Sequence, residues 1–128
     1  MPYRFQKHYT IDQARALLPQ IREWLAEIHQ LRRRLKQLDA RIGQIVSSGA
    51  DAGGESVNSQ LKLIADLQHV FREFEQRQIQ IKEVDRGLID FPAIIGDKEV
   101  FLCWEQDEAD IEFWHDLDTG YAGRERLS

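Results

Sequence analysis

The chain has 128 residues, of which 42% are hydrophobic, and a formal net charge of −5. This size and composition predict a single domain, residues 1–128, with enough apolar side chains for its own core. The single cysteine, Cys103, excludes an intramolecular disulfide and suits a reducing compartment. No apolar run approaches the roughly 20 residues that span a bilayer, and the N-terminus lacks the apolar stretch of a secretory signal. We therefore expect a soluble, cytoplasmic protein with no membrane partner.

Charge is distributed unevenly along the chain. Residues 1–48 contain nine Lys and Arg against four Asp and Glu, whereas residues 49–128 contain eight against eighteen. Two interpretations are open: two separately solvated surfaces, or a basic face that meets an acidic face in the same chain or in a partner. The acidic C-terminal part argues against nucleic acid as the main ligand.

Apolar residues predict two long helices. Spacings of four and three predict a first helix over about 11–46, capped by Thr10 and Gln13, with a kink or break near Pro19. A glycine-rich turn at 47–54 precedes a second helix over about 55–79, so the two form an antiparallel hairpin. The predicted seam of the first helix is Leu17, Ile21, Trp24, Ile28, Leu31, Leu35, Leu38, Ile42 and Ile45. That of the second is Val57, Gln60, Ile64, Leu67, Phe71, Phe74 and Gln78, widened by Leu63 and Val70.

After residue 80 the hydrophobic period changes from about 3.5 to 2, which predicts strands. We expect strands at 80–84, 93–95, 99–104 and 110–115, with a two-residue hairpin turn at Gly96-Asp97. Pro92 assigns residues 88–91 to an edge strand or a connection, and residues 3–9 allow a short edge strand. The predicted fold class is α+β: a long, coiled-coil-like antiparallel helical hairpin within 1–79, packed at its base against a small antiparallel sheet within 80–128. Trp24, Phe71 and Phe74 are expected in the core between them.

Three segments carry a resemblance to a known family. They are KEVDRGLIDFPAI, EVFLCW and FWHDLDTGYAGR, and the N-terminal YTIDQARALLPQI adds to them. The chain resembles the bacterial domain-of-unknown-function family 2203 over nearly its whole length, most specifically in residues 82–124. The resemblance implies a bacterial origin and no assigned activity.

Six residues at predicted strand ends or turns form the candidate ligand-binding site. One interpretation is a polar pocket, a divalent metal site or an acid–base pair; the other is ordinary turn chemistry and a clasp for the C-terminal tail. Adjacent strand residues point to opposite faces, so His115 and Asp116 cannot chelate one ion together without a bend. We expect Arg124 to fold back and pair with a carboxylate. The six residues are Asp85, Asp90, Trp104, His115, Asp116 and Arg124.

The other candidates favour structural roles. Cys103 is interpreted as a buried strand residue, His8, His29 and His69 as solvated side chains, and the basic run at 32–36 as the charged flank of the helix. No phosphate loop, dinucleotide fingerprint or nucleophile elbow is present in the sequence. The sequence therefore names no catalytic residue, no metal ligand set and no cofactor.

Two functions remain open at this point. The first is a protein-interaction or self-association module, more a binding protein than an enzyme, which forms a homodimer through the hairpin because apolar residues such as Leu61 and Leu63 stay uncovered near its tip. The second is a small metal protein or enzyme that uses the Asp and His residues at the strand ends.

Overall fold

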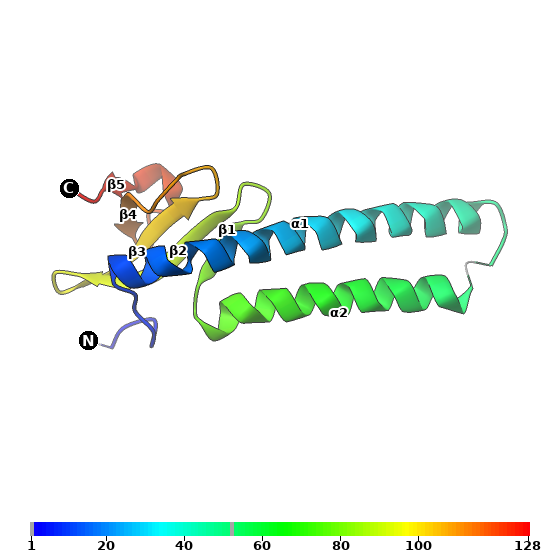
Figure 1. The fold of residues 1–128 in the computed structure, drawn as a ribbon, viewed down its shortest axis with the longest axis horizontal. Helices are drawn as coiled ribbons and strands as arrows, with labels where there is room; N and C mark the ends of the chain where they lie inside the picture. The colour runs from blue at the N-terminus through cyan, green and yellow to red at the C-terminus, as the bar shows by residue number, and fades with distance from the viewer. Residues whose placement is uncertain (1, 52) are drawn as a thin grey trace. The chain divides into compact units, whose positions relative to one another are not determined.

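A computed structural model describes residues 2–51 and 53–128 (Figure 1). The chain divides into two compact units, Met1–Leu25 with Glu73–Ser128, and Ala26–Arg72. Two helices come first, α1 at Ile11–Ser47 and α2 at Gly54–Gln76, close to their predicted bounds. Neither is long and apolar enough to cross a membrane.

The start of α1 is fixed by the predicted capping box. The Gln13 backbone N–H donates to Thr10 Oγ1 at 3.0 Å, and the Thr10 N–H donates to Gln13 Oε1 at 3.1 Å. These two bonds satisfy backbone donors that have no partner within the helix. The helix then continues through Pro19 to Ser47, so the break that proline allows does not occur.

The inner face of α2 agrees with the predicted seam only in part. The seam residues Leu67 and Phe74 are buried, as are the flanking Leu63 and Val70, whereas Ile64 is 37% exposed and Phe71 is only partly buried. Both sets have helical spacing, so periodicity alone did not show which set faces α1. The prediction that Leu63 is uncovered and that Phe71 is a core residue is therefore wrong.

Five strands follow in one antiparallel sheet, ordered as in the sequence. They are β1 (Gln80–Glu83), β2 (Leu88–Ile95), β3 (Lys98–Glu105), β4 (Phe113–Asp116) and β5 (Glu125–Arg126), with a short 3-10 turn, η1, at Tyr121–Gly123. The structure thus contains two helices that pack against each other and one antiparallel sheet, which confirms the α+β class. Gly96 has φ 63° in the predicted two-residue turn, which leaves Ile95 paired with Lys98.

Pro92 lies inside β2, an interior strand of the sheet, and not in an edge strand or a connection. Its carbonyl accepts the Tyr9 backbone N–H at 2.8 Å. The N and C=O of one strand residue point to the same side, so the Pro92 nitrogen also faces this N-terminal segment. The missing N–H therefore removes no bond to β3, and the expectation that Pro92 marks an edge is corrected.

Both faces of β2 and β3 are covered. On one face Phe91 packs against Tyr9, and Arg22 of α1 lies over the Trp104 ring, 4.9 Å from its centroid. On the other face Phe5 packs against Phe101, and the C-terminal tail adds a second cover. The expected edge strand at 3–9 is absent, and these residues form irregular cover instead.

The start of α1 and the end of α2 supply the remaining core of the unit that contains the sheet. Phe74 is 1% exposed, and its ring lies 5.3 Å from that of Trp24. Trp24 itself is only partly buried, and the Arg77 guanidinium lies over its ring, 4.9 Å from the centroid. Of the three aromatics expected in the core, Phe74 is fully buried, whereas Trp24 and Phe71 are both only partly buried.

Candidate functional site

A buried ion pair joins two of the predicted site residues. His115 on β4 and Asp90 on β2 are each 1% exposed, and His115 Nε2 lies 2.9 Å from Asp90 Oδ2. The second ring nitrogen, Nδ1, lies 2.7 Å from the backbone carbonyl of Asp116. Charged groups are rarely buried unless they are paired, so this pair is the most unusual polar feature of the sheet.

The surroundings of His115 decide its protonation. Burial alone would favour the neutral ring. Hydrogen bonding with Asp90, with Cys103 and with the Asp116 carbonyl outweighs that effect and raises the pKa of His115 to about 10. At neutral pH the two side chains therefore form an imidazolium–carboxylate pair.

Cys103 belongs to the same cluster, which the sequence analysis did not predict. It lies on β3 directly opposite Asp90, and it is completely buried. One ligand atom each from Asp90, Cys103 and His115 lie within 4.8 Å of one another. The signal was in the sequence, because a two-residue turn at Gly96-Asp97 sets the register that pairs residue 90 with residue 103.

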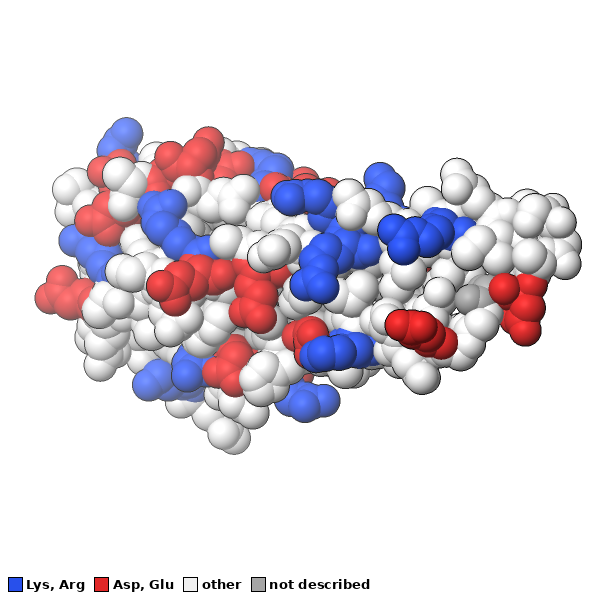
Figure 2. Space-filling view, turned by 45° about the vertical axis from the view of Figure 1, so that its right-hand side comes forward, with Lys and Arg blue, Asp and Glu red and all other residues white. Residues whose placement is uncertain are grey.

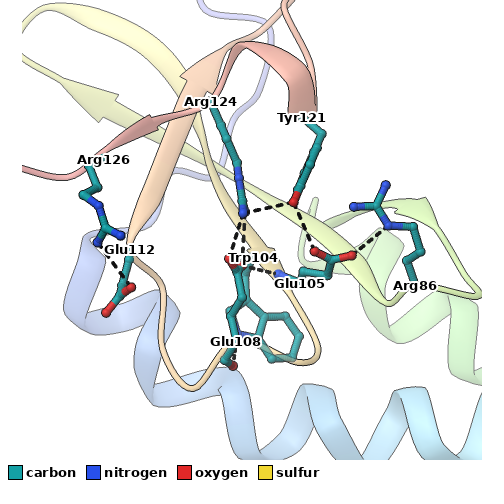
Figure 3. Close-up of polar contacts among 8 residues, drawn as sticks. All are labelled: Arg86, Trp104, Glu105, Glu108, Glu112, Tyr121, Arg124 and Arg126. Carbon is teal, nitrogen blue, oxygen red and sulfur yellow. Dashed lines mark hydrogen bonds and ion pairs between the residues drawn. The ribbon is translucent and has the colours of Figure 1, made fainter.

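Arg124 folds back over the sheet, but its carboxylate partner is Glu108. The closest nitrogen and oxygen atoms of this pair are 2.9 Å apart, and both side chains are largely buried (Figure 3). The guanidinium also lies over the rings of Phe113 and Tyr121, at 3.8 and 4.1 Å from their centroids. Such stacking and pairing fix a planar cation strongly, so Arg124 fastens the C-terminal tail to the sheet.

Further polar side chains continue from Arg124 across the sheet (Figure 3). The Tyr121 hydroxyl lies 3.1 Å from the Arg124 guanidinium and 3.4 Å from Glu105. Glu105 in turn accepts a 2.7 Å hydrogen bond from Arg86, which lowers the pKa of the Glu105 carboxyl. Glu108 was missed because its partner Arg124 comes from the tail, whose path the strand pattern does not define. Glu105 was missed because it pairs with Arg86 in the turn between β1 and β2 and with Tyr121 in the tail.

The three remaining predicted residues lie apart from the buried pair. Asp85 is exposed in the turn between β1 and β2. Trp104 occupies the opposite face from Cys103 and donates its Nε1–H to the Glu108 carbonyl at 3.0 Å, so it forms no wall beside Asp90. The Asp116 carboxylate pairs with Lys98 at 2.6 Å, and only its backbone carbonyl reaches His115.

The cluster is suited to holding charge within the fold more than to reacting with a substrate. Asp90, Cys103 and His115 are all less than 2% exposed, so their side chains are closed to solvent in this conformation. A nucleophile must reach the atom that it attacks, which a completely buried thiol cannot do here.

Comparison with known proteins identifies the family but no activity. The model of the family described as "Uncharacterized conserved protein (DUF2203)" matches residues 7–127, and the chain belongs to this family. The chain is also 25% identical over 114 residues to a serine–tRNA ligase of Synechococcus elongatus. That match covers 88% of this chain and 27% of the ligase, so the chain spans about a quarter of its length. No solved structure shows significant similarity.

Proposed function

We propose that the protein is a self-association module in which the helical hairpin packs against a second copy of itself. One observation carries this proposal. Of the large hydrophobic side chains that are exposed in the described residues, four lie in the unit Ala26–Arg72: Val46, Val57, Leu61 and Ile64. Clustered apolar exposure of this kind is typical of protein interfaces.

Three of these side chains form a regular stripe on α2. Val57, Leu61 and Ile64 are 42%, 58% and 37% exposed, and the partly buried Phe71 continues the same stripe. The spacing of four, then three, is that of residues that meet a partner helix in a coiled coil. We call this set the outer stripe. It is separate from the buried residues Leu63, Leu67 and Val70 on the same helix.

The border of the outer stripe is uncharged over most of its length. Gln68 is an exposed polar residue within the stripe, between Ile64 and Phe71. Asn58 and Ala65 are exposed beside the stripe, and the first charged residue at this border is Arg72. In the view of Figure 2, Lys and Arg gather along part of the hairpin, whereas its end near the connecting loop is largely uncharged. A stripe without border charges can meet an identical stripe without like-charge repulsion.

The stripe is complementary to itself when two copies run antiparallel. A two-fold axis beside Ile64 places Ile64 against its own counterpart, Val57 against Phe71, and Leu61 against Gln68 of the partner. Such a contact is closed, because each copy contributes the same surface. The two hairpins then contribute four helices to one bundle, which is a common stable arrangement.

Solution mass tests the proposal directly. Wild-type protein at micromolar concentration should sediment at twice the 15.0 kDa of the chain. Leu61→Glu places a charge in the stripe and should shift the species to the monomer mass. Ser59→Glu adds the same charge at an exposed position on the other side of α2, and it should leave the dimer intact. A monomeric wild type, or equal effects of both variants, would reject self-association through this stripe.

Cysteine cross-linking tests the antiparallel arrangement. Ile64→Cys should form a disulfide-linked dimer under mild oxidation, because the axis brings the two residues together. Leu61→Cys should not, since its two copies are displaced by about 9 Å along the helix axis, beyond disulfide reach. Equal cross-linking at both positions would indicate a parallel pair instead. The native Cys103 is completely buried and gives no competing reaction in the folded protein.

The same proposal includes a cytoplasmic location in a bacterium and a protein partner in place of nucleic acid. The single cysteine suits a reducing compartment, the net charge of −5 disfavours nucleic acid, and the similarity to a protein of Synechococcus elongatus supports the bacterial origin.

A further inference from the structure

The buried cluster on the sheet combines three types of metal ligand. Asp90, Cys103 and His115 come from β2, β3 and β4, and their candidate ligand atoms lie within 4.8 Å of one another. Their backbones are fixed by ladder pairing, which joins Asp90 to Cys103 and Phe101 to His115. The three side chains therefore converge from the rigid centre of the sheet, where a site is defined more precisely than in a loop.

The orientation of His115 matches that of a metal-bound histidine. Its Nδ1 lies 2.7 Å from the Asp116 carbonyl, an interaction in which the ring N–H donates. Nε2 then faces Asp90 and the cluster. Metal-binding histidines usually donate their other ring N–H to a carbonyl or carboxylate in this way, because that bond fixes the ring and the tautomer.

An unsatisfied oxygen provides an independent observation. Asp90 Oδ2 pairs with His115, but Asp90 Oδ1 is buried and has no hydrogen-bond partner among the described residues. Leaving such an atom without a partner costs about 1–3 kcal/mol. A cation at the cluster would satisfy both carboxylate oxygens, whereas the ion pair alone satisfies one.

We propose that Asp90, Cys103 and His115 form a buried binding site for a zinc ion. Thiolate, imidazole and carboxylate are the three ligand types that zinc uses in proteins, whereas calcium and magnesium prefer oxygen ligands only. The two Asp90 oxygens, the Cys103 sulfur and His115 Nε2 supply four donor atoms. The complete burial of the cluster fits a structural ion more than a catalytic one, because catalytic sites keep an open position.

Charge and proton balance are compatible with this site. Zinc binding converts the Cys103 thiol to a thiolate and the His115 imidazolium to imidazole, so two protons are released. The product is neutral, with one dication and two anionic ligands, and the empty cluster is neutral as well. Arg124 interacts with Cys103, but its charge is neutralised by Glu108 at 2.9 Å. The zinc site therefore adds no uncompensated charge to the core.

Metal uptake by the full chain provides the test. The protein is unfolded, freed of metal with a chelator, and refolded with zinc chloride or with cobalt chloride, since a closed site fills most readily during folding. We expect one zinc per chain by elemental analysis after desalting. The cobalt form should show a sulfur-to-metal charge-transfer band in the near ultraviolet, which reports the Cys103 ligand without any mutation.

Conservative variants identify the ligands. Cys103→Ser should abolish the charge-transfer band, and Asp90→Asn and His115→Gln should each weaken zinc binding by at least about tenfold, the loss seen when even a supporting group is removed. His29→Gln and Asp97→Asn change the same residue types away from the cluster and should bind as the wild type does. The proposal is overturned if wild-type protein refolded with zinc retains none, or if its cobalt spectrum has no charge-transfer band.

Discussion

The two compact units differ in how far they bury their side chains. In the unit that contains the sheet, β2 and β3 are buried on both faces, and even Asp90 and His115 are closed to solvent. In the hairpin unit, Ala26–Arg72, large apolar side chains such as Leu61 and Val46 are more than half exposed. The first unit buries most of its large apolar side chains and pairs the buried Asp90 with His115, whereas the second keeps four large apolar side chains exposed.

Phenylalanine residues three positions apart on α2 provide the largest expected contrast. Phe74 is 1% exposed beside Trp24, whereas Phe71 is only partly buried in the outer stripe. Phe74→Ala should lower the free energy of unfolding by about 3–5 kcal/mol through lost contacts and a cavity. Phe71→Ala should cost less than half of that in a denaturant melt at low protein concentration. Equal losses would mean that both phenylalanines belong to one core.

A buried and an exposed ion pair should differ in how much stability is lost when one partner is removed. Asp90→Asn leaves the buried imidazolium without a counter-charge and should cost about 3 kcal/mol. Lys98→Ala removes a partner from Asp116 in a pair whose side chains are 62% and 40% exposed, and it should cost about 0–1 kcal/mol. Both are measured by denaturant unfolding with a chelator present. Similar losses for the two variants would show that the Asp90 pair is effectively solvated.

The helices show how far apolar spacing predicts packing. Their bounds followed from period and capping, because those signals are local. The inner face of α2 followed only in part, since Leu67 is buried as predicted, but the flanking Leu63 and Val70 are buried in place of Val57 and Ile64. A broad apolar face defines a helix well, but the neighbouring helix decides which part of that face becomes core.

The site was predictable to the extent that strand register defines it. The hairpin turn at Gly96-Asp97 implies the pairing of Asp90 with Cys103, which brings the thiol to the buried ion pair. The partner of Arg124 could not be derived in this way. Its position depends on the turn at Gly120, which has φ 67°, and on Glu108 in an irregular loop. Local pattern does not encode such a long-range contact between a tail and a loop.

Substitutions at Arg124 test whether the C-terminal tail stabilises the sheet that it covers. Arg124→Ala removes the pair with Glu108 and the stacking on Phe113 and Tyr121, and it should lower the free energy of unfolding by roughly 2 kcal/mol. Arg124→Lys keeps the charge but loses the planar contact, so it should recover only part of the loss. Limited proteolysis should also cleave the tail of the alanine variant faster. A change within about 0.5 kcal/mol would show that the tail is not fastened by this residue.

The smallest expected effect concerns Glu99, which holds the N-terminal segment on the sheet face that the C-terminal tail also covers. Its carboxylate accepts the backbone N–H groups of Arg4 and Phe5 at 2.7 and 3.0 Å, and His8 Nε2 lies 2.7 Å from it. Burial opposes the ionised form, but these hydrogen bonds prevail and lower the pKa of Glu99 below its usual 4.5. A carboxyl with a lowered folded pKa stabilises the protein above its unfolded pKa, and this stabilisation is lost as the pH falls through the folded value.

Glu99→Gln should therefore cost roughly 1 kcal/mol at pH 7, and the difference from wild type should shrink as the solution is acidified below pH 4.5. Unfolding curves recorded from neutral to acidic pH measure this difference. If it stays constant across that range, the ionised carboxylate does not hold the N-terminal segment on the sheet, and the cover of this face depends on Phe5 and the tail alone.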